Sequence, residues 1–213
     1  MTGGEAPRIT ILENGPYLVR GGIPITDAAG NRLEAKEPYA LCRCGGSSSK
    51  PFCDGTHKRN GFAGEELADR GPIAARRIAY RASGIVVYDD RSVCSHAGHC
   101  TEGLPAVFRS KADPWIDPGG ATVEEIVEAV RRCPSGALSY ALGDSAEPAE
   151  ESRSLGITAS KDGPYHVAGG VPLLSAGGAP YEIRQRYALC RCGHSRNKPL
   201  CDGTHWKVAF KAA

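Results

Sequence analysis

The chain lacks several features that mark common classes of protein. No apolar run approaches the ~18 residues of a membrane-spanning helix, and the start, MTGGEAPRIT, has neither the basic nor the apolar part of a signal peptide. The net charge is only +2, so no field of one sign favours nucleic acid or an anionic membrane as partner. No G-x-G-x-x-G fingerprint follows an expected strand, which leaves direct binding of a nicotinamide or flavin unsupported. We therefore expect a cytoplasmic protein whose partners are neither nucleic acids nor membranes.

Aromatic residues are also scarce, at 7%, whereas the chain has 27 glycines and 15 prolines. This composition is typical of small, turn-rich modules rather than of one large hydrophobic core. Nine cysteines are many for a chain without an export signal. Because a reducing compartment does not maintain disulfides, and because an odd number cannot pair completely, metal ligation explains these cysteines better.

The chain contains an internal repeat. Residues 9–57 align with residues 157–205 without a gap, and over half of the aligned residues are identical. In each copy an Asn-Gly-Pro or Asp-Gly-Pro turn and a later Gly-Gly pair separate short alternating stretches, which predicts short strands. We predict an α+β protein with two small β-rich modules.

The segment between the repeats has a different pattern. Residues 122–133 are predicted to form a helix, because Thr122 and Glu125 match a capping box and the apolar residues that follow recur at helical spacing. Residues 85–88 and 137–140 are predicted strands, which gives a small α+β domain. A polar run after it looks like a linker. The predicted domains are therefore 1–64, 72–143 and 157–213, with residues 144–156 as the linker.

Each repeat carries the spacing Cys-x-Cys-x8-Cys-x3-His. Thiolates are soft ligands suited to iron-sulfur clusters, and a 2Fe-2S cluster takes two protein ligands on each iron. The first two cysteines can hold one iron while the last cysteine and the histidine hold the other. Zinc is the alternative, since three cysteines and a histidine also suit one tetrahedral ion. The candidate ligands are Cys42, Cys44, Cys53 and His57 in the first copy and Cys190, Cys192, Cys201 and His205 in the second.

Other residues of the two cysteine loops have predicted supporting roles. Serine hydroxyls are expected to donate hydrogen bonds to cluster sulfurs, basic side chains to offset the negative charge of the cluster, and an aspartate to cap a single helical turn that aims the histidine inward. The alternative is that these are ordinary solvated loop residues. They are Ser47, Arg43, Lys50 and Asp54 in the first copy and Ser195, Arg191, Lys198 and Asp202 in the second.

The runs CRCGGSSSKPFCDGTH and CRCGHSRNKPLCDGTH resemble the CDGSH iron-sulfur domain, with Thr56 and Thr204 where the family name has serine. This resemblance covers the two repeated segments. It implies a redox-active 2Fe-2S cluster, bound by three cysteines and one histidine, in each module. It also implies two modules packed side by side, here as a pseudo-dimer within one chain, so we expect a monomer.

A histidine ligand has two expected consequences. As a neutral ligand in place of a thiolate it makes the cluster less negative, which raises the reduction potential. Because acid competes with iron for the imidazole, we also predict that both 2Fe-2S clusters are lost faster as the pH falls toward ~6.

The three remaining cysteines, Cys94, Cys100 and Cys133, form a third candidate site. The first two keep the outer spacing of the ferredoxin motif C-x2-C-x2-C, Ala97 stands where the middle cysteine belongs, and Cys133 precedes a proline. Three thiolates suit a 3Fe-4S cluster, or a 4Fe-4S cluster whose fourth iron takes His96, His99 or an outside ligand. The stretch from Val93 to CPSGALSY resembles the divergent single-cluster ferredoxin domain, whose Cys-x-His-x3-Cys start favours His96. The alternative is a vacant or zinc-filled site.

The strong motifs are all sites for one-electron cofactors, and we find no catalytic signature, nucleophile or acid-base pair. We therefore expect an electron carrier, not an enzyme, that exchanges electrons with redox partner proteins. A cluster donor to apo-acceptors, or a redox or pH sensor, is the second possibility, and a metal-stabilised interaction module is the third.

Three residues outside the motifs have other predicted roles. Trp115 is predicted to pack in a core or over a cluster. His166 and His194 have no counterpart in the other repeat and are predicted to be solvated.

Overall fold

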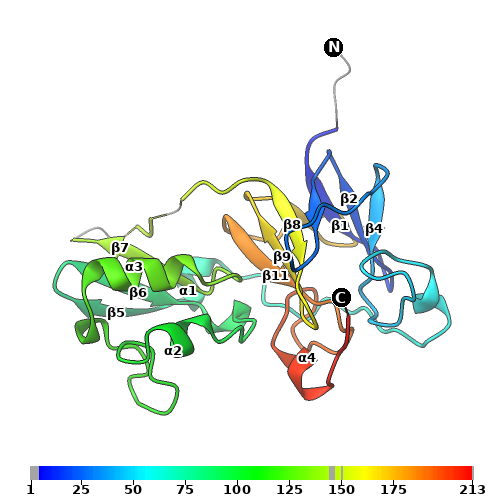
Figure 1. Cartoon of the computed structure of the whole chain (residues 1–213). Helices are drawn as coiled ribbons and strands as arrows, with labels where there is room; N and C mark the ends of the chain where they lie inside the picture. Colours follow the sequence, from blue (N-terminus) through cyan, green and yellow to red (C-terminus); the bar gives the residue numbers. More distant parts are fainter. Residues whose placement is uncertain (1–4, 144–146, 150, 213) are drawn as a thin grey trace.

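A computed structural model describes residues 5–143, 147–149 and 151–212. Three parts follow one another in space: the central domain, then the second repeat, then the first repeat (Figure 1). The predicted α+β class, with two β-rich modules and a mixed domain between them in sequence, is confirmed. In space, however, the second repeat lies in the middle.

Each repeat supplies four short strands, and in the first two of each repeat the residues alternate between buried and partly exposed positions, as the pattern predicts. The predicted turns are present, because Asn14 and Asp162 have φ values of 44° and 53° and connect the first two strands of each repeat. The strands are β1 (Arg8–Ile11), β2 (Tyr17–Arg20), β3 (Ile25–Thr26) and β4 (Tyr39–Leu41), then β8 (Gly156–Ala159), β9 (Tyr165–Ala168), β10 (Leu173–Leu174) and β11 (Arg186–Leu189).

The two repeats exchange a strand. One sheet has the order β10-β1-β2-β4 and the other β11-β9-β8-β3, so each sheet ends in a strand from the other repeat. The exchanged strands pair in parallel, with Ile9 opposite Leu173 and Ile25 opposite Ile157. The predicted pseudo-dimer within one chain is therefore confirmed, as an intertwined pair.

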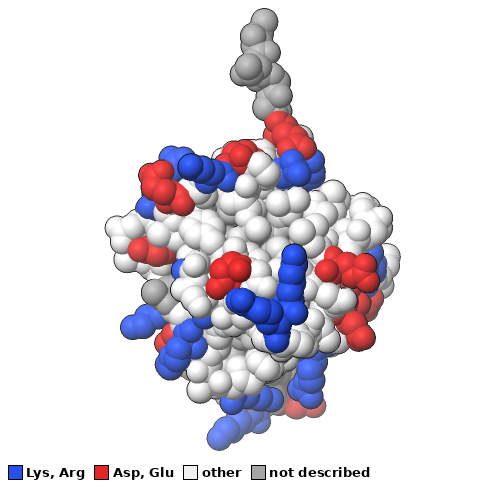
Figure 2. Space-filling view, turned by 90° about the vertical axis from the view of Figure 1, so that its right-hand side faces the viewer, with Lys and Arg blue, Asp and Glu red and all other residues white. Residues whose placement is uncertain are grey.

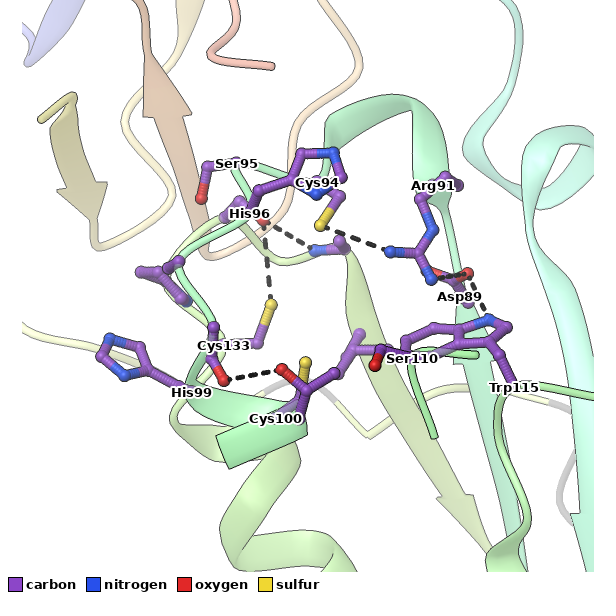
Figure 3. A pocket seen from close by; sticks show the side chains of 17 residues that line it. Asp89, Arg91, Cys94, Ser95, His96, His99, Cys100, Ser110, Trp115 and Cys133 are labelled. Atoms are coloured by element: carbon purple, nitrogen blue, oxygen red, sulfur yellow. Dashed lines mark hydrogen bonds and ion pairs between the residues drawn. The ribbon is translucent and has the colours of Figure 1, made fainter. Parts of the chain in front are cut away.

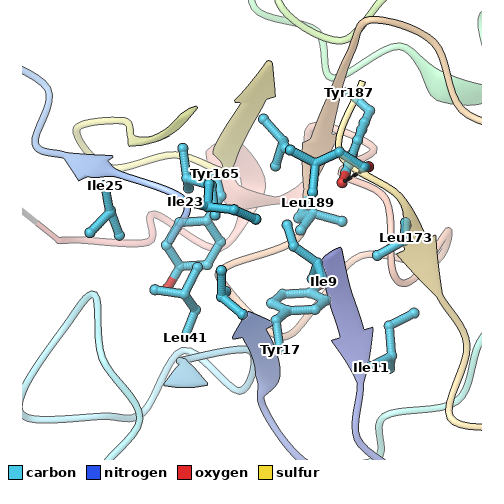
Figure 4. Close-up of a cluster of buried hydrophobic side chains, with 14 of the residues drawn as sticks. Ile9, Ile11, Tyr17, Ile23, Ile25, Leu41, Tyr165, Leu173, Tyr187 and Leu189 are labelled. Atoms are coloured by element: carbon cyan, nitrogen blue, oxygen red, sulfur yellow. Dashed lines mark hydrogen bonds between the residues drawn. The ribbon is translucent and has the colours of Figure 1, made fainter. Parts of the chain in front are cut away.

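The intertwined sheets share one hydrophobic core, which includes Ile9 and Leu41 of the first repeat and Leu173 and Leu189 of the second (Figure 4). Two buried tyrosines cross between the repeats. The hydroxyl of Tyr17 lies 3.0 Å from the carbonyl oxygen of Cys190 and 2.9 Å from that of Pro199. In return, the hydroxyl of Tyr165 lies 2.9 Å from the carbonyl oxygen of Cys42 and 2.8 Å from that of Pro51. Each repeat thus braces the cysteine loop of the other.

Replacement of Tyr165 by phenylalanine is expected to lower the free energy of unfolding by about 1–3 kcal/mol, because it removes the buried hydroxyl donor shared by the carbonyl oxygens of Cys42 and Pro51. Tyr17→Phe is the matched variant and is expected to cost a similar amount. Urea unfolding followed by far-UV circular dichroism measures both. Unchanged midpoints in both variants would contradict a bracing role for these hydroxyls.

The central domain has a three-stranded antiparallel sheet, β5 (Ile78–Ala82), β6 (Ile85–Asp89) and β7 (Leu138–Leu142), covered by α3 (Val123–Arg131). The predicted capping box of α3 is present: Thr122 Oγ1 accepts a hydrogen bond from the backbone N–H of Glu125, and the Glu125 carboxylate accepts one from that of Thr122. The remaining short elements are η1 (Thr56–Lys58), α1 (Ile73–Arg76), η2 (Arg91–Val93), α2 (His99–Gly103), η3 (Pro118–Gly120) and α4 (Thr204–Lys207).

None of the helices in the part of the chain that the structure describes is both long and apolar enough to cross a bilayer. Basic and acidic side chains are interspersed on the face shown in Figure 2, as the small net charge predicts. Of the predicted linker 144–156, residues 144–146 and 150 lie outside the described residues.

Candidate iron-sulfur sites

The donor atoms of each repeat gather in two pairs. After β4 the sulfur atoms of Cys42 and Cys44 lie 3.9 Å apart. Cys53 precedes η1 and His57 lies within it, with Sγ of Cys53 3.4 Å from Nδ1 of His57. In the second repeat the corresponding distances are 3.9 Å for Cys190 and Cys192 and 3.4 Å for Cys201 and His205.

These distances suit one metal ion per pair. Two thiolates at bond lengths of ~2.3 Å on one tetrahedral ion lie ~3.8 Å apart, and a thiolate and an imidazole lie slightly closer. Among the described residues, no group of three or more His, Cys, Asp or Glu side chains is placed to hold a single ion. Two ligand pairs match the two irons of a 2Fe-2S cluster, so the residues fit the group that the spacing predicts.

Backbone N–H groups support the sulfurs in both repeats. Gly55 N lies 3.5 Å from Cys53 Sγ, and Gly203 N lies 3.5 Å from Cys201 Sγ. The residue two positions after the second cysteine of each repeat, Gly46 or His194, also directs its N–H at that cysteine's sulfur. Donors of this kind stabilise thiolate charge and tune a cluster. These donors are not apparent from the sequence, because they depend on loop conformation rather than on side-chain type.

The predicted supporting serines and lysines have other partners. Ser47 donates its hydroxyl hydrogen to the carbonyl oxygen of Phe52, at 2.6 Å, instead of to a sulfur. Lys50 donates to the carbonyl oxygen of Ser47, at 2.6 Å, so it holds the loop together. Ser195 and Lys198 repeat these bonds in the second module. Through these bonds the serines and lysines shape the cysteine loops.

The predicted arginines and aspartates are also structural. Arg43 is only 1% exposed and lies between the rings of Tyr17 and Phe62, with Nη2 donating to the carbonyl oxygen of Gly64 at 2.7 Å. Its positive charge is therefore buried behind the cysteine loop, and Arg191 is placed in the same way. Asp54 accepts hydrogen bonds from the N–H groups of Ser48 and Thr56, which joins both ends of the loop, although Gly55 is the N-cap residue of η1.

The two CDGSH sites differ in exposure although their ligands are the same. In the first repeat Cys44, Cys53 and His57 are partly exposed. In the second repeat all four ligands are buried, and His205 is only 4% exposed. Trp206 covers the His205 ring, with ring centroids 4.9 Å apart, where the first repeat has Lys58.

Burial changes the protonation of the second site. It lowers the pKa of His205; the Asp202 carboxylate opposes this shift and His96 of the central domain adds to it. It raises the pKa of Cys201 to about 12. Without a bound cation this thiol is neutral at pH 7, so binding of iron must release a proton.

The central site is a cavity of about 490 Å³ between η2, α2 and the start of β7. The sulfur atoms of Cys94, Cys100 and Cys133 all face it, whereas the imidazole of His99 points away (Figure 3). Burial raises the pKa of Cys100 to about 11, with a further contribution from Cys133. The structure thus brings the three predicted thiols together, and three sulfur donors in one cavity suit an iron-sulfur cluster.

Two charged residues that line this cavity, Arg91 and Asp89, were not predicted as part of it. Arg91 places Nη1 3.7 Å from Cys94 Sγ and its guanidinium 4.0 Å from the centre of the Trp115 ring. Trp115 lines the cavity and donates its indole N–H to Oδ2 of Asp89 at 3.2 Å. A cation beside a thiolate lowers the energy of the charged form.

His96 lies at the boundary of the central domain. Its φ of 53° turns the loop after Cys94, and its side chain packs against Gly203 of the second repeat. Ligation of the central cluster by His96 stays a prediction.

His166 of the second repeat was predicted to be solvated, and this is wrong. Its Nε2 is shielded from solvent. Burial, with smaller effects of His99 and His205, lowers its pKa to about 4.

Comparisons with known proteins agree with this geometry. The family described as "Iron-binding zinc finger CDGSH type" matches residues 14–58 and 162–206, and the family described as "Divergent 4Fe-4S mono-cluster" matches residues 80–143. A protein of Escherichia coli K12, "Uncharacterized protein YjdI", is 39% identical over 61 residues, which are 29% of this chain and 80% of the relative. Its counterpart from E. coli O157:H7 matches equally well. No solved structure matches significantly.

Proposed function

Because the chain belongs to the CDGSH iron-sulfur proteins, with a divergent 4Fe-4S mono-cluster domain between its two CDGSH modules, we propose that it is a three-cluster electron-transfer protein rather than an enzyme. Each module would hold a 2Fe-2S cluster through its three cysteines and one histidine. Cys94, Cys100 and Cys133 would hold a cluster of three or four irons, with His96 as the candidate fourth ligand. Bound clusters supply one-electron redox chemistry, and the protein supplies their ligands, burial and charge.

The observation that carries this proposal is the grouping of donors. Two pairs in each CDGSH module match a two-iron cluster better than one zinc ion, and three thiols share the central cavity. Iron and sulfide counts, with visible and EPR spectra of anaerobically prepared protein, test it. We expect four outer irons and three or four central ones per chain. Colourless, redox-silent protein that contains zinc alone would reject the proposal.

The histidine ligands are expected to set the potentials of the outer clusters. His57→Cys and His205→Cys each replace a neutral ligand by a thiolate, which makes the cluster more negative, so each variant is expected to lower the potential of its own cluster. Film voltammetry of the two single variants measures this. Two unchanged potentials would count against ligation by histidine.

A second candidate function is donation of a 2Fe-2S cluster to an apo-protein, which the partial exposure of Cys44, Cys53 and His57 favours at the first site. Incubation with an apo-ferredoxin distinguishes the two functions. Transfer of an intact cluster supports donation, whereas rapid reversible reduction without transfer supports electron carriage.

A further inference from the structure

The central domain packs against the cysteine loop of the second CDGSH module, which runs from Cys190 to His205. A Cβ atom placed on Gly203, two residues before the ligand His205, would lie 2.9 Å from the Cβ of His96. His96 in turn follows Cys94 by only two residues. The loops that carry ligands of the central site and of the second 2Fe-2S site are therefore in van der Waals contact.

The first module offers the internal comparison. Gly55 is the counterpart of Gly203 and has nearly the same conformation, with φ values of 84° and 79°. A Cβ placed on Gly55 would meet no atom within 4 Å. The ligand loop of the first site is thus open at the position where the second is covered by the central domain.

Further contacts hold the central domain in this place. Asn197, in the second cysteine loop, donates to the carbonyl oxygen of Ser92 at 2.6 Å. Arg186 of β11 donates to the carbonyl oxygens of Val130, at 2.9 Å, and of Cys133, itself a predicted ligand. These bonds join the segments that precede Cys94 and that contain Cys133 to the second module.

The two CDGSH loops also touch one another. A Cβ placed on Gly45 would lie 2.4 Å from the carbonyl oxygen of Cys192, and one placed on Gly193 would lie 2.7 Å from that of Cys44. The order of contact is therefore central site, second CDGSH site, first CDGSH site, which is the order of the three parts in Figure 1.

We propose that the three sites form a linear electron-transfer chain, in which the second CDGSH site is the intermediate carrier between the central site and the first CDGSH site. This inference rests on the proposed electron-transfer function. With clusters bound, each step would move one electron from one cluster, which is oxidised, to the next, which is reduced. A one-electron redox protein donates the electron at one end of the line, and another accepts it at the other. Electron tunnelling weakens steeply with distance. Because the central domain contacts the second CDGSH site directly, the central site is expected to couple more strongly to the second CDGSH site than to the first.

EPR spectroscopy of the full chain reduced with dithionite tests this order. His57→Cys and His205→Cys identify the two 2Fe-2S signals, since each variant alters one of them and keeps four ligands. The microwave power that half-saturates each signal is then compared between the chain with a filled central site and the Cys100→Ser chain. Fast-relaxing central iron raises this power in a nearby cluster, so we expect a several-fold rise at the second site and a smaller one at the first. An equal rise at both sites, or a larger rise at the first, would overturn the proposed order of transfer.

A matched pair of substitutions tests the contact itself. Gly203→Ala and Gly55→Ala impose the same backbone strain, but only the first also forces His96 away. Gly203→Ala is expected to reduce the relaxation enhancement at the second site, and Gly55→Ala to leave it unchanged. Equal behaviour of the two variants would reject the contact as the route. Iron and sulfide counts separate this from a failure of the proposed function: a chain without clusters refutes both, whereas a loaded chain with the wrong order refutes only the proposed order of transfer.

Discussion

At pH 6 the first CDGSH site is expected to lose its iron several-fold faster than the second, although the two sites have identical ligands. His57 is partly exposed, so solvent protons reach it directly. His205 is buried, and burial lowers its pKa. A lowered pKa means that the His205 imidazole takes up a proton less readily, so the second site is expected to keep its histidine ligand for longer.

Visible absorbance after a jump from pH 8 to pH 6 measures this difference as two kinetic phases. The fast phase is expected to disappear in His57→Cys and to remain in His205→Cys. Trp206→Lys gives the second site the residue that the first has at Lys58, and it is expected to bring the slow phase closer to the fast one because it uncovers His205. A single phase in the native chain, or loss that stays flat between pH 8 and 6, would contradict the prediction.

Gly45→Ala is expected to destabilise the protein by clearly more than Gly55→Ala. Both glycines have a positive φ, of 74° and 84°, which costs an alanine about 1–2 kcal/mol. Only Gly45 faces a backbone atom of the other module, the carbonyl oxygen of Cys192, and overpacking there adds about 1–3 kcal/mol. The added methyl group would separate the two cysteine loops.

Chemical unfolding of the two variants, loaded with iron to the same extent, measures the difference in the free energy of unfolding. Because the backbone strain is shared, the excess for Gly45→Ala reports the contact between the modules. Equal losses in both variants would show that the loops have room to separate.

The local structure of this protein follows closely from its sequence. The Cys-x-Cys-x8-Cys-x3-His spacing places its donors in pairs, because each half of the motif spans one tight turn. The capping box at Thr122 starts α3, and the turns at Asn14 and Asp162 form where glycine and proline follow. Each of these features depends on residues within a few positions of one another.

The packing of the two repeats as a pseudo-dimer was predicted, but the exchange of strands between them was not. Strands β3 and β10 have only two residues each, so their parallel partners in the opposite repeat leave no periodic pattern. The difference between the two ligand sites arises where His96 meets Gly203, at a long sequence distance, and the repeats themselves are identical at that glycine. His166 was misjudged for the same reason, since its surroundings come from other elements.

The crossed tyrosines also set the order in which the protein can be completed during synthesis. The carbonyl oxygens of Cys42 and Pro51 in the first cysteine loop share the hydroxyl of Tyr165, which leaves the ribosome more than a hundred residues later. It follows that iron is stably inserted at the N-terminal site only after the C-terminal half has emerged. Nascent chains stalled at residue 143 are therefore expected to retain no iron at this site, and radioactive iron bound to such ribosome complexes measures it.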